Sequence, residues 1–218
     1  IFVNLIVGLS VGPNAVLANL IGQKKRDEIS GMLHTILAFG GILGLVMMGL
    51  GWASARVVLE LSGTPESVMD QALLYIRIYF VSLPFMMIYN FGSAALRSFG
   101  DTKRPMYYLI LSGIVNVILN LVLVICFGLG VAGVSNVLSA ALILIYLYRR
   151  EDEFAFRFEK LKIEKDSLVR ILRIGIPSGI QGAIFSVSNV FIQSGINSFG
   201  EAAIAGSSLA LNFEYFMT

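Results

Sequence analysis

The sequence has few of the residues on which enzymes, metal sites and disulfide-stabilised folds depend. It contains one cysteine, Cys126, and one histidine, His34, in 218 residues. A lone cysteine forms no disulfide within the chain, and a lone histidine without cysteines beside it makes no zinc site. The apolar segments hold no neighbouring pair of acidic residues, and the sequence has no phosphate-binding P-loop motif. We therefore expect no enzyme activity, no metal and no cofactor.

The sequence also has few charged residues and many hydrophobic ones. Charged residues make up 14% of the chain and hydrophobic residues 56%, with a mean hydropathy of +0.81. That is more apolar surface than one soluble core of this size could bury, so the composition predicts a membrane protein. Segments of about 20 apolar residues match the thickness of a bilayer when helical. Seven such segments predict an all-α, polytopic helical bundle, at residues 1–21, 32–59, 72–96, 106–127, 131–148, 171–198 and 200–218.

The few cations are gathered into alternate connections between these segments. All of the 16 lysines and arginines except Arg56 and Arg77 lie in or beside three stretches, at residues 24–28, 97–104 and 149–173. Cations in short loops remain on the cytoplasmic side during insertion. We therefore expect a multi-pass protein of the cell membrane with loops 24–28, 97–104 and 149–170 in the cytoplasm. A net charge of +2 gathered in this way gives no reason to expect a nucleic-acid partner.

Glycines and prolines inside the segments predict how the helices pack. Glycines four residues apart allow helix backbones to approach closely in lipid, and such pairs are Gly8 and Gly12, Gly40 and Gly44, and Gly175 and Gly179. Pro13 and Pro84 lie within apolar segments, where each removes one backbone hydrogen bond and is expected to bend its helix.

Polar side chains within the apolar segments are the candidate site residues. They are Asn116, Asn120, Gln181, Asn189, Gln193, Asn212 and Glu214. Asn116 and Asn120 are four residues apart, so they share one helix face and either join a neighbouring helix or line a polar cavity. Glu214 falls near the bilayer centre, where a carboxyl group is costly enough to indicate a function or a bonding partner.

Several stretches resemble the MATE (multidrug and toxic compound extrusion) transporters. They are "SVGPNAVLANLIGQKKRDE", "YIRIYFVSLPFMMIYNFGSAALRSFGDTKRPM", "NVILN", "GLGVAGVSNVLS" and "RILRIGIPSGIQ", which occur in the same order as in that family. The resemblance implies twelve helices in two bundles of six. It also implies export of cationic or amphipathic organic compounds in exchange for protons or sodium ions, by a full-length chain acting as a monomer.

By this resemblance the sequence is part of a longer protein and covers roughly helices two to eight. Residues 1–148 would form a first bundle lacking its first helix, 149–170 a cytoplasmic linker, and 171–218 the start of the second bundle. Asn120 stands where many relatives have aspartate, and Phe185 where some have a coupling glutamate. Glu214 matches a position that is often acidic. The resemblance leaves the coupling ion open.

Two other functions fit a polytopic helical protein. A lipid-linked oligosaccharide flippase of a related superfamily would be expected to place several cations in its central cavity, whereas the apolar segments, outside the three charged stretches, hold only Arg56 and Arg77. A channel or structural subunit would need neither bent helices nor a repeat of two bundles.

Overall fold

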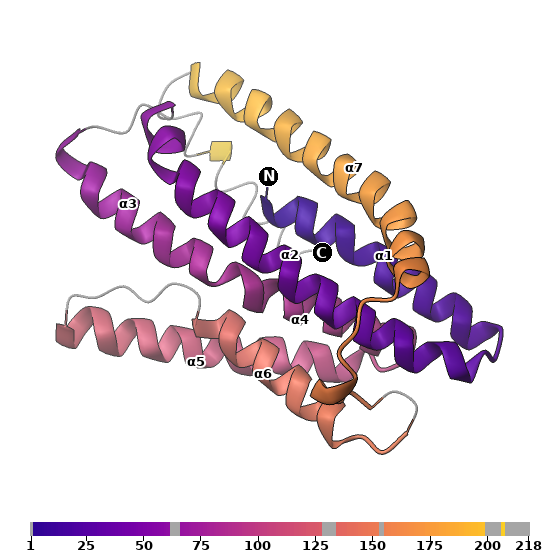
Figure 1. The fold of residues 1–218 in the computed structure, drawn as a ribbon. Coiled ribbons are helices and arrows are strands. Elements are labelled where there is room, and N and C mark those ends of the chain that lie inside the picture. Colours follow the sequence, from indigo (N-terminus) through magenta and orange to yellow (C-terminus); the bar gives the residue numbers. More distant parts are fainter. Residues whose placement is uncertain (1, 62–65, 128–133, 153–154, 199–205, 208–218) are drawn as a thin grey trace.

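The chain folds into a bundle of long helices (Figure 1). The computed structural model describes residues 2–61, 66–127, 134–152, 155–198 and 206–207. Its helices are α1 (Phe2–Gly22), α2 (Arg26–Leu61), α3 (Glu66–Val81), α4 (Leu83–Ser98), α5 (Lys103–Phe127), α6 (Val134–Arg149) and α7 (Lys165–Ser198), with a short 3-10 helix at Phe158–Lys160. The described residues include no strand, which confirms the all-α fold class.

The predicted segments match these helices closely, with one interruption. The expected segment 72–96 consists of two helices, α3 and α4, which are separated at Ser82. Pro84 lies two residues further on, in the first turn of α4, and it lacks the backbone N–H that a regular helix hydrogen bond needs at this point. The structure therefore divides this segment at Ser82, close to Pro84. Pro13 lies inside the continuous helix α1. The segment predicted at residues 200–218 lies almost entirely outside the described residues.

Helix α4 forms the centre of the first six helices. It packs against α1, α2, α5 and α6, and the described part of it buries an unbroken run of side chains from Phe91 to Leu96. Gly40 of α2 faces the ring of Phe91, and a Cβ at Gly44 would lie 2.5 Å from the Cα of Pro84. The predicted close approach at this glycine pair therefore occurs where α2 crosses the helix break.

Apolar side chains also cover the outside of the bundle. Large hydrophobic residues are exposed along α2, α5 and α7, including Leu45, Ile118 and Phe191. Among the described residues, three stretches are long and apolar enough to cross a bilayer: Glu28–Glu60, Met69–Ser98 and Lys165–Asn189. Exposed apolar side chains on helices of this length are typical of a membrane protein.

The charged turn between α4 and α5 is stabilised locally. Gly100 has a φ of +82°, a conformation that costs glycine little, and the following backbone N–H of Asp101 bonds to the carbonyl of Leu96. The Asp101 carboxylate accepts a hydrogen bond from the backbone N–H of Arg104 at 3.2 Å, which caps the start of α5. The guanidinium of Arg104 in turn lies 4.5 Å from the ring centre of Tyr146 on α6.

The connection from α6 to α7 is fixed to α2 by two buried polar side chains. His34 is only 2% exposed and stacks on Phe156. Its Nδ1 lies 2.6 Å from the carbonyl oxygen of Ser30, and its Nε2 accepts the backbone N–H of Arg157 at 3.0 Å. These partners assign the proton to Nδ1. His34 is thus buried beneath the connection between α6 and α7.

Thr35 makes the second connection. Its hydroxyl donates to the carbonyls of Gly31 and Lys162 and accepts the backbone N–H of Glu164 at 3.1 Å. Helix α7 begins immediately afterwards, at Lys165, inside the range predicted as linker. Nearer α6, the hydrogen bond from Arg150 to Asp152 raises the pKa of the Arg150 guanidinium, so that the linker keeps this positive charge at any physiological pH.

Candidate functional site

The first candidate region is the contact between α1 and α7, the most extensive contact between two helices in the structure. The two helices run side by side in opposite directions (Figure 1). A Cβ at Gly12 would lie 2.5 Å from the carbonyl oxygen of Ile171, and one at Gly8 would overlap the carbonyl of Ser178. From the other helix, a Cβ at Gly175 would lie 3.0 Å from the carbonyl oxygen of Leu9. The glycine pairs found in the sequence therefore face each other across this contact.

A polar link lies at the end of the same contact. The side-chain amide of Asn4 donates to the Ser186 hydroxyl at 2.8 Å, and this hydroxyl donates to the carbonyl of Gly182 at 3.0 Å. Gly182 also needs to lack a side chain, because a Cβ there would lie 2.6 Å from the carbonyl oxygen of Asn4. Backbone contact and one hydrogen bond therefore hold the two helices in register.

The predicted site residues are distributed over three parts of the chain. Asn116 is half-buried on α5, and Asn120 belongs to the same uninterrupted helix, although its side chain lies outside the described residues. Gln181 and Asn189 are exposed on α7. The side chain of Gln193 lies outside the described residues, as do Asn212 and Glu214 altogether. Their roles as cavity residues stay predictions.

Other polar contacts were not anticipated from the sequence. The Asn136 side chain on α6 donates to the Ser82 hydroxyl at 3.2 Å, which places an amide against the break between α3 and α4. One turn further, the hydroxyl of Ser139 donates to that of Ser112 on α5 at 2.7 Å. The three-residue spacing of Asn136 and Ser139 was the available signal. These contacts fix α6 to the remainder of the bundle.

Arg77 is the one cation of α3, and it lies against an aromatic ring. Its guanidinium carbon is 5.4 Å from the ring centre of Trp52 on α2. Its Nε is buried and has no hydrogen-bond partner among the described residues. Arg56, the other cation outside the charged loops, pairs with Glu60 at 2.9 Å on an exposed helix face. Within the part of the chain that the structure describes, neither residue joins a cluster of cations.

The chemistry available to these regions is that of packing and polar contact. Among the described residues, no group of three or more histidine, cysteine or acidic side chains could hold a metal ion. The contact between α1 and α7 instead contains glycines that let the two backbones approach closely.

Comparison with known proteins gives a consistent result. The family model described as MatE matches residues 1–122. The probable multidrug resistance protein YoeA of Bacillus subtilis is 32% identical over 94% of this chain and 47% of its own length. The multidrug export protein MepA of Staphylococcus saprophyticus is 22% identical, again over 94% of this chain and 47% of its own length. The chain thus spans about half the length of the curated relatives it matches.

Solved structures show the same fold. A MOP superfamily transporter from Pyrococcus furiosus superposes with a TM-score of 0.85 at 22% identity, covering 97% of this chain and 49% of the other. The Vibrio cholerae MATE transporter VcmN in its bent form gives a TM-score of 0.81 at 23% identity, over 98% of this chain and 50% of the other.

Proposed function

Because this chain belongs to the MATE family of membrane transporters, we propose that it forms part of a secondary antiporter that exports drugs. The proposed substrates are small cationic or amphipathic organic compounds, exchanged for protons or sodium ions by a monomer of the full-length chain without a cofactor. The observation that carries this proposal is the family match over residues 1–122. Relatives named for multidrug resistance and multidrug export support the substrate class.

The division into two bundles follows from the same proposal. Residues 1–148 would belong to the first bundle, 149–170 to the linker and 171–218 to the second bundle. The contact between α1 and α7 would then be a contact between bundles, because α1 also packs on α2 and α4 whereas α7 begins the next repeat. Its small residues suit a pair of bundles that rock against each other to expose the cavity alternately.

The test of the function is gradient-driven flux in the full-length protein. Reconstituted in liposomes, it should move a fluorescent organic cation when a sodium or proton gradient is imposed, and not when the gradient is dissipated. If the protein moves a fluorescent lipid-linked oligosaccharide instead, it is a flippase. If the flux of the organic cation does not depend on either gradient, the protein is a channel. Arg77 packs against Trp52 and Arg56 pairs with Glu60, so neither of these two cations belongs to a cluster in a central cavity of the kind that a pyrophosphate headgroup would require, which favours the exporter.

The Asn116 and Asn120 pair is expected to line the cavity of the first bundle. Amides in lipid need polar partners, and a substrate pathway provides them. Asn120→Leu should lower the initial transport rate about fivefold, which corresponds to the loss of one hydrogen bond of about 1 kcal/mol. Protein abundance should stay near that of the parent. Ile118→Leu, an exposed position on the same helix, is the control and should transport normally. A collapse of abundance in the Asn120 variant would show instead that the amides join helices.

The orientation of the loops is a separate prediction. The cations at residues 24–28, 97–104 and 149–170 place those loops in the cytoplasm, and Thr64 on the opposite side. In a cysteine-free background that includes Cys126→Ser, we expect Lys103→Cys to react with a membrane-impermeant maleimide only after the membrane is opened. Thr64→Cys should react in intact cells. Reaction of both from the same side would contradict the proposed topology.

A further inference from the structure

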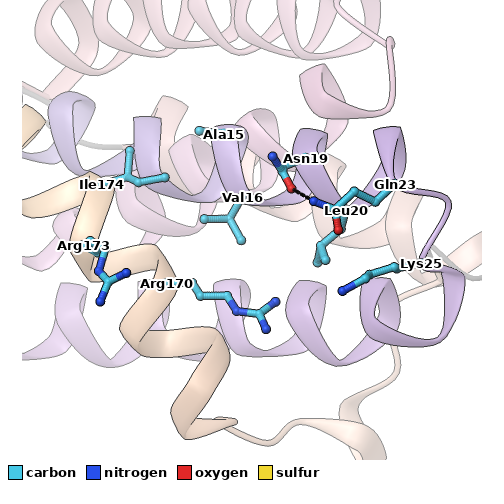
Figure 2. Close-up of a pocket in the computed structure, with 9 residues that line it drawn as sticks. All are labelled: Ala15, Val16, Asn19, Leu20, Gln23, Lys25, Arg170, Arg173 and Ile174. Atoms are coloured by element: carbon cyan, nitrogen blue, oxygen red, sulfur yellow. Dashed lines mark hydrogen bonds between the residues drawn. The ribbon is translucent and has the colours of Figure 1, made fainter.

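A hollow of about 490 Å³ lies at the linker end of the α1 and α7 contact and is not used in the proposed transport cycle. Figure 2 shows its lining: Asn19 comes from the last turn of α1, Gln23 and Lys25 from the connection that follows, and Arg170 and Arg173 from α7. Lys25 and two neighbouring arginines of α7, which are far from Lys25 in the sequence, thus converge on one space. By the charge pattern this end is the cytoplasmic one.

The hollow carries more positive than negative charge. Lys25 and Arg170 both pair with the same carboxylate, that of Glu28, at 3.3 Å and 3.0 Å. Among the described residues, Arg173 has neither an ion pair nor a hydrogen bond. One carboxylate facing three cations leaves a positive site that an anionic group would complete.

The neighbouring amides add neutral donors. The Gln23 side-chain amide donates to the Asn19 carbonyl oxygen at 2.5 Å (Figure 2). This contact uses the side-chain oxygen of Asn19. The side-chain N–H groups of Asn19 have no hydrogen-bond partner within the described part of the chain. Two N–H donors beside cationic side chains suit the oxygens of a phosphate group.

An apolar surface continues from the charged end of the hollow. Val16 and Ile174 line the hollow itself. Arg173 also borders a second hollow of about 440 Å³, whose other lining residues are Val169, Leu172, Ile176 and Pro177. Arg173 therefore stands between a polar space and an apolar groove along α7. The ligand that fits both is an amphipathic anion, with a charged head and a hydrocarbon tail.

We propose that this hollow binds the phosphate headgroup of an acidic phospholipid from the cytoplasmic leaflet, with an acyl chain along the apolar groove of α7. The proposal rests on the membrane orientation given under the proposed function. Basic hollows between helices on that side of a membrane are suited to anionic headgroups. The lipid would bridge residues of the first bundle, Lys25 and Asn19, to residues of α7, Arg170 and Arg173.

The experiment measures lipid binding by the full-length protein in neutral detergent, without substrate or ion gradient. Dioctanoyl phosphatidylglycerol is titrated while the thermal unfolding temperature is followed, and dioctanoyl phosphatidylcholine and inorganic phosphate are titrated in parallel. Phosphatidylglycerol should raise the unfolding temperature saturably, whereas the other two should not. Arg173→Gln should weaken its half-saturation about fivefold, the usual effect of one cation at a lipid surface. Lys165→Gln removes the same charge from an exposed position of α7 outside the hollow and should leave half-saturation unchanged.

Three results would overturn the proposal. In the first case, phosphatidylglycerol fails to bind saturably. In the second case, it binds the Arg173 and Lys165 variants equally. In the third case, inorganic phosphate alone would reproduce the shift with the same dependence on Arg173, which would make the hollow a site for a free anion. Unfolding temperatures without lipid check that both variants are folded. Because binding is measured apart from flux, failure of this proposal and failure of the transport function give different results.

Discussion

Gly12→Ala is expected to destabilise the full-length protein and to lower its transport rate, although it adds a single methyl group. The new Cβ would lie 2.5 Å from the carbonyl oxygen of Ile171 and 2.9 Å from the backbone nitrogen of Gly175. Both neighbours are backbone atoms, so α1 and α7 must move apart to accept it. Overpacking of this kind costs about 1–3 kcal/mol. The measurement is the thermal unfolding temperature of the purified protein, together with drug flux in liposomes.

The matched control is Gly49→Ala, on α2. No atom lies within 4 Å of a Cβ built at Gly49, apart from the atoms of its own helix and chain neighbours. Alanine is the better helix former by about 1 kcal/mol, so this variant should be as stable as the parent or more stable. Equal unfolding temperatures for the Gly12 and Gly49 variants would mean that α1 and α7 are not in backbone contact in the working protein.

Glu214→Gln is expected to have the largest effect on transport. Glu214 lies outside the described residues, and the prediction rests on the sequence, where this carboxyl group falls near the bilayer centre. Glutamine keeps the size and one hydrogen-bonding face of the side chain but cannot bind and release a proton or a sodium ion. We expect the variant to bind substrate while its gradient-driven export falls about tenfold, within the usual range of coupling between two sites.

The comparison variant for this position is Glu214→Asp, which retains the carboxyl group and should keep part of the export. Substrate affinity and flux need to be measured on the same preparations, with sodium and proton gradients applied separately and over a range of pH. Export by the Gln variant at the parental rate under all these conditions would assign Glu214 a structural hydrogen bond. Coupling would then depend on residues outside this sequence.

The helices of this protein could be predicted from the sequence because one physical constraint determines them. In lipid every backbone group needs a partner within its own segment, so a long apolar run has to be helical. The break at Ser82 was also predictable from Pro84, since proline acts on its own helix. The residues at which helices begin and end were harder to predict from the sequence. Charged residues favour water but can continue a helix, so α7 begins at Lys165 within the expected linker.

Helix partners could not be predicted in the same way. The spacing of Gly8 and Gly12 indicates a close approach, but any small-residue face could oppose it, and only the folded chain shows that it meets Gly175. The hydrogen bond from Asn136 to Ser82 joins positions 54 residues apart. The positions of Lys25 and Arg173 are adequately explained by topology alone, so nothing in the sequence distinguishes cations that share a hollow from cations that only face water.

The contacts of His34 and Thr35 attach the chain to α2 beside the first residue of α7, so a tilt of α7 would have its smallest displacement at that end. These contacts hold the chain just before Lys165, where α7 begins. The helix has 34 residues, which at about 1.5 Å per residue gives a length of about 51 Å. Tilting it by about 10° around the attached end would move the opposite end by about 9 Å, close to the diameter of a helix. A tilt of α7 about this end would therefore be small beside the linker and large at Ser198.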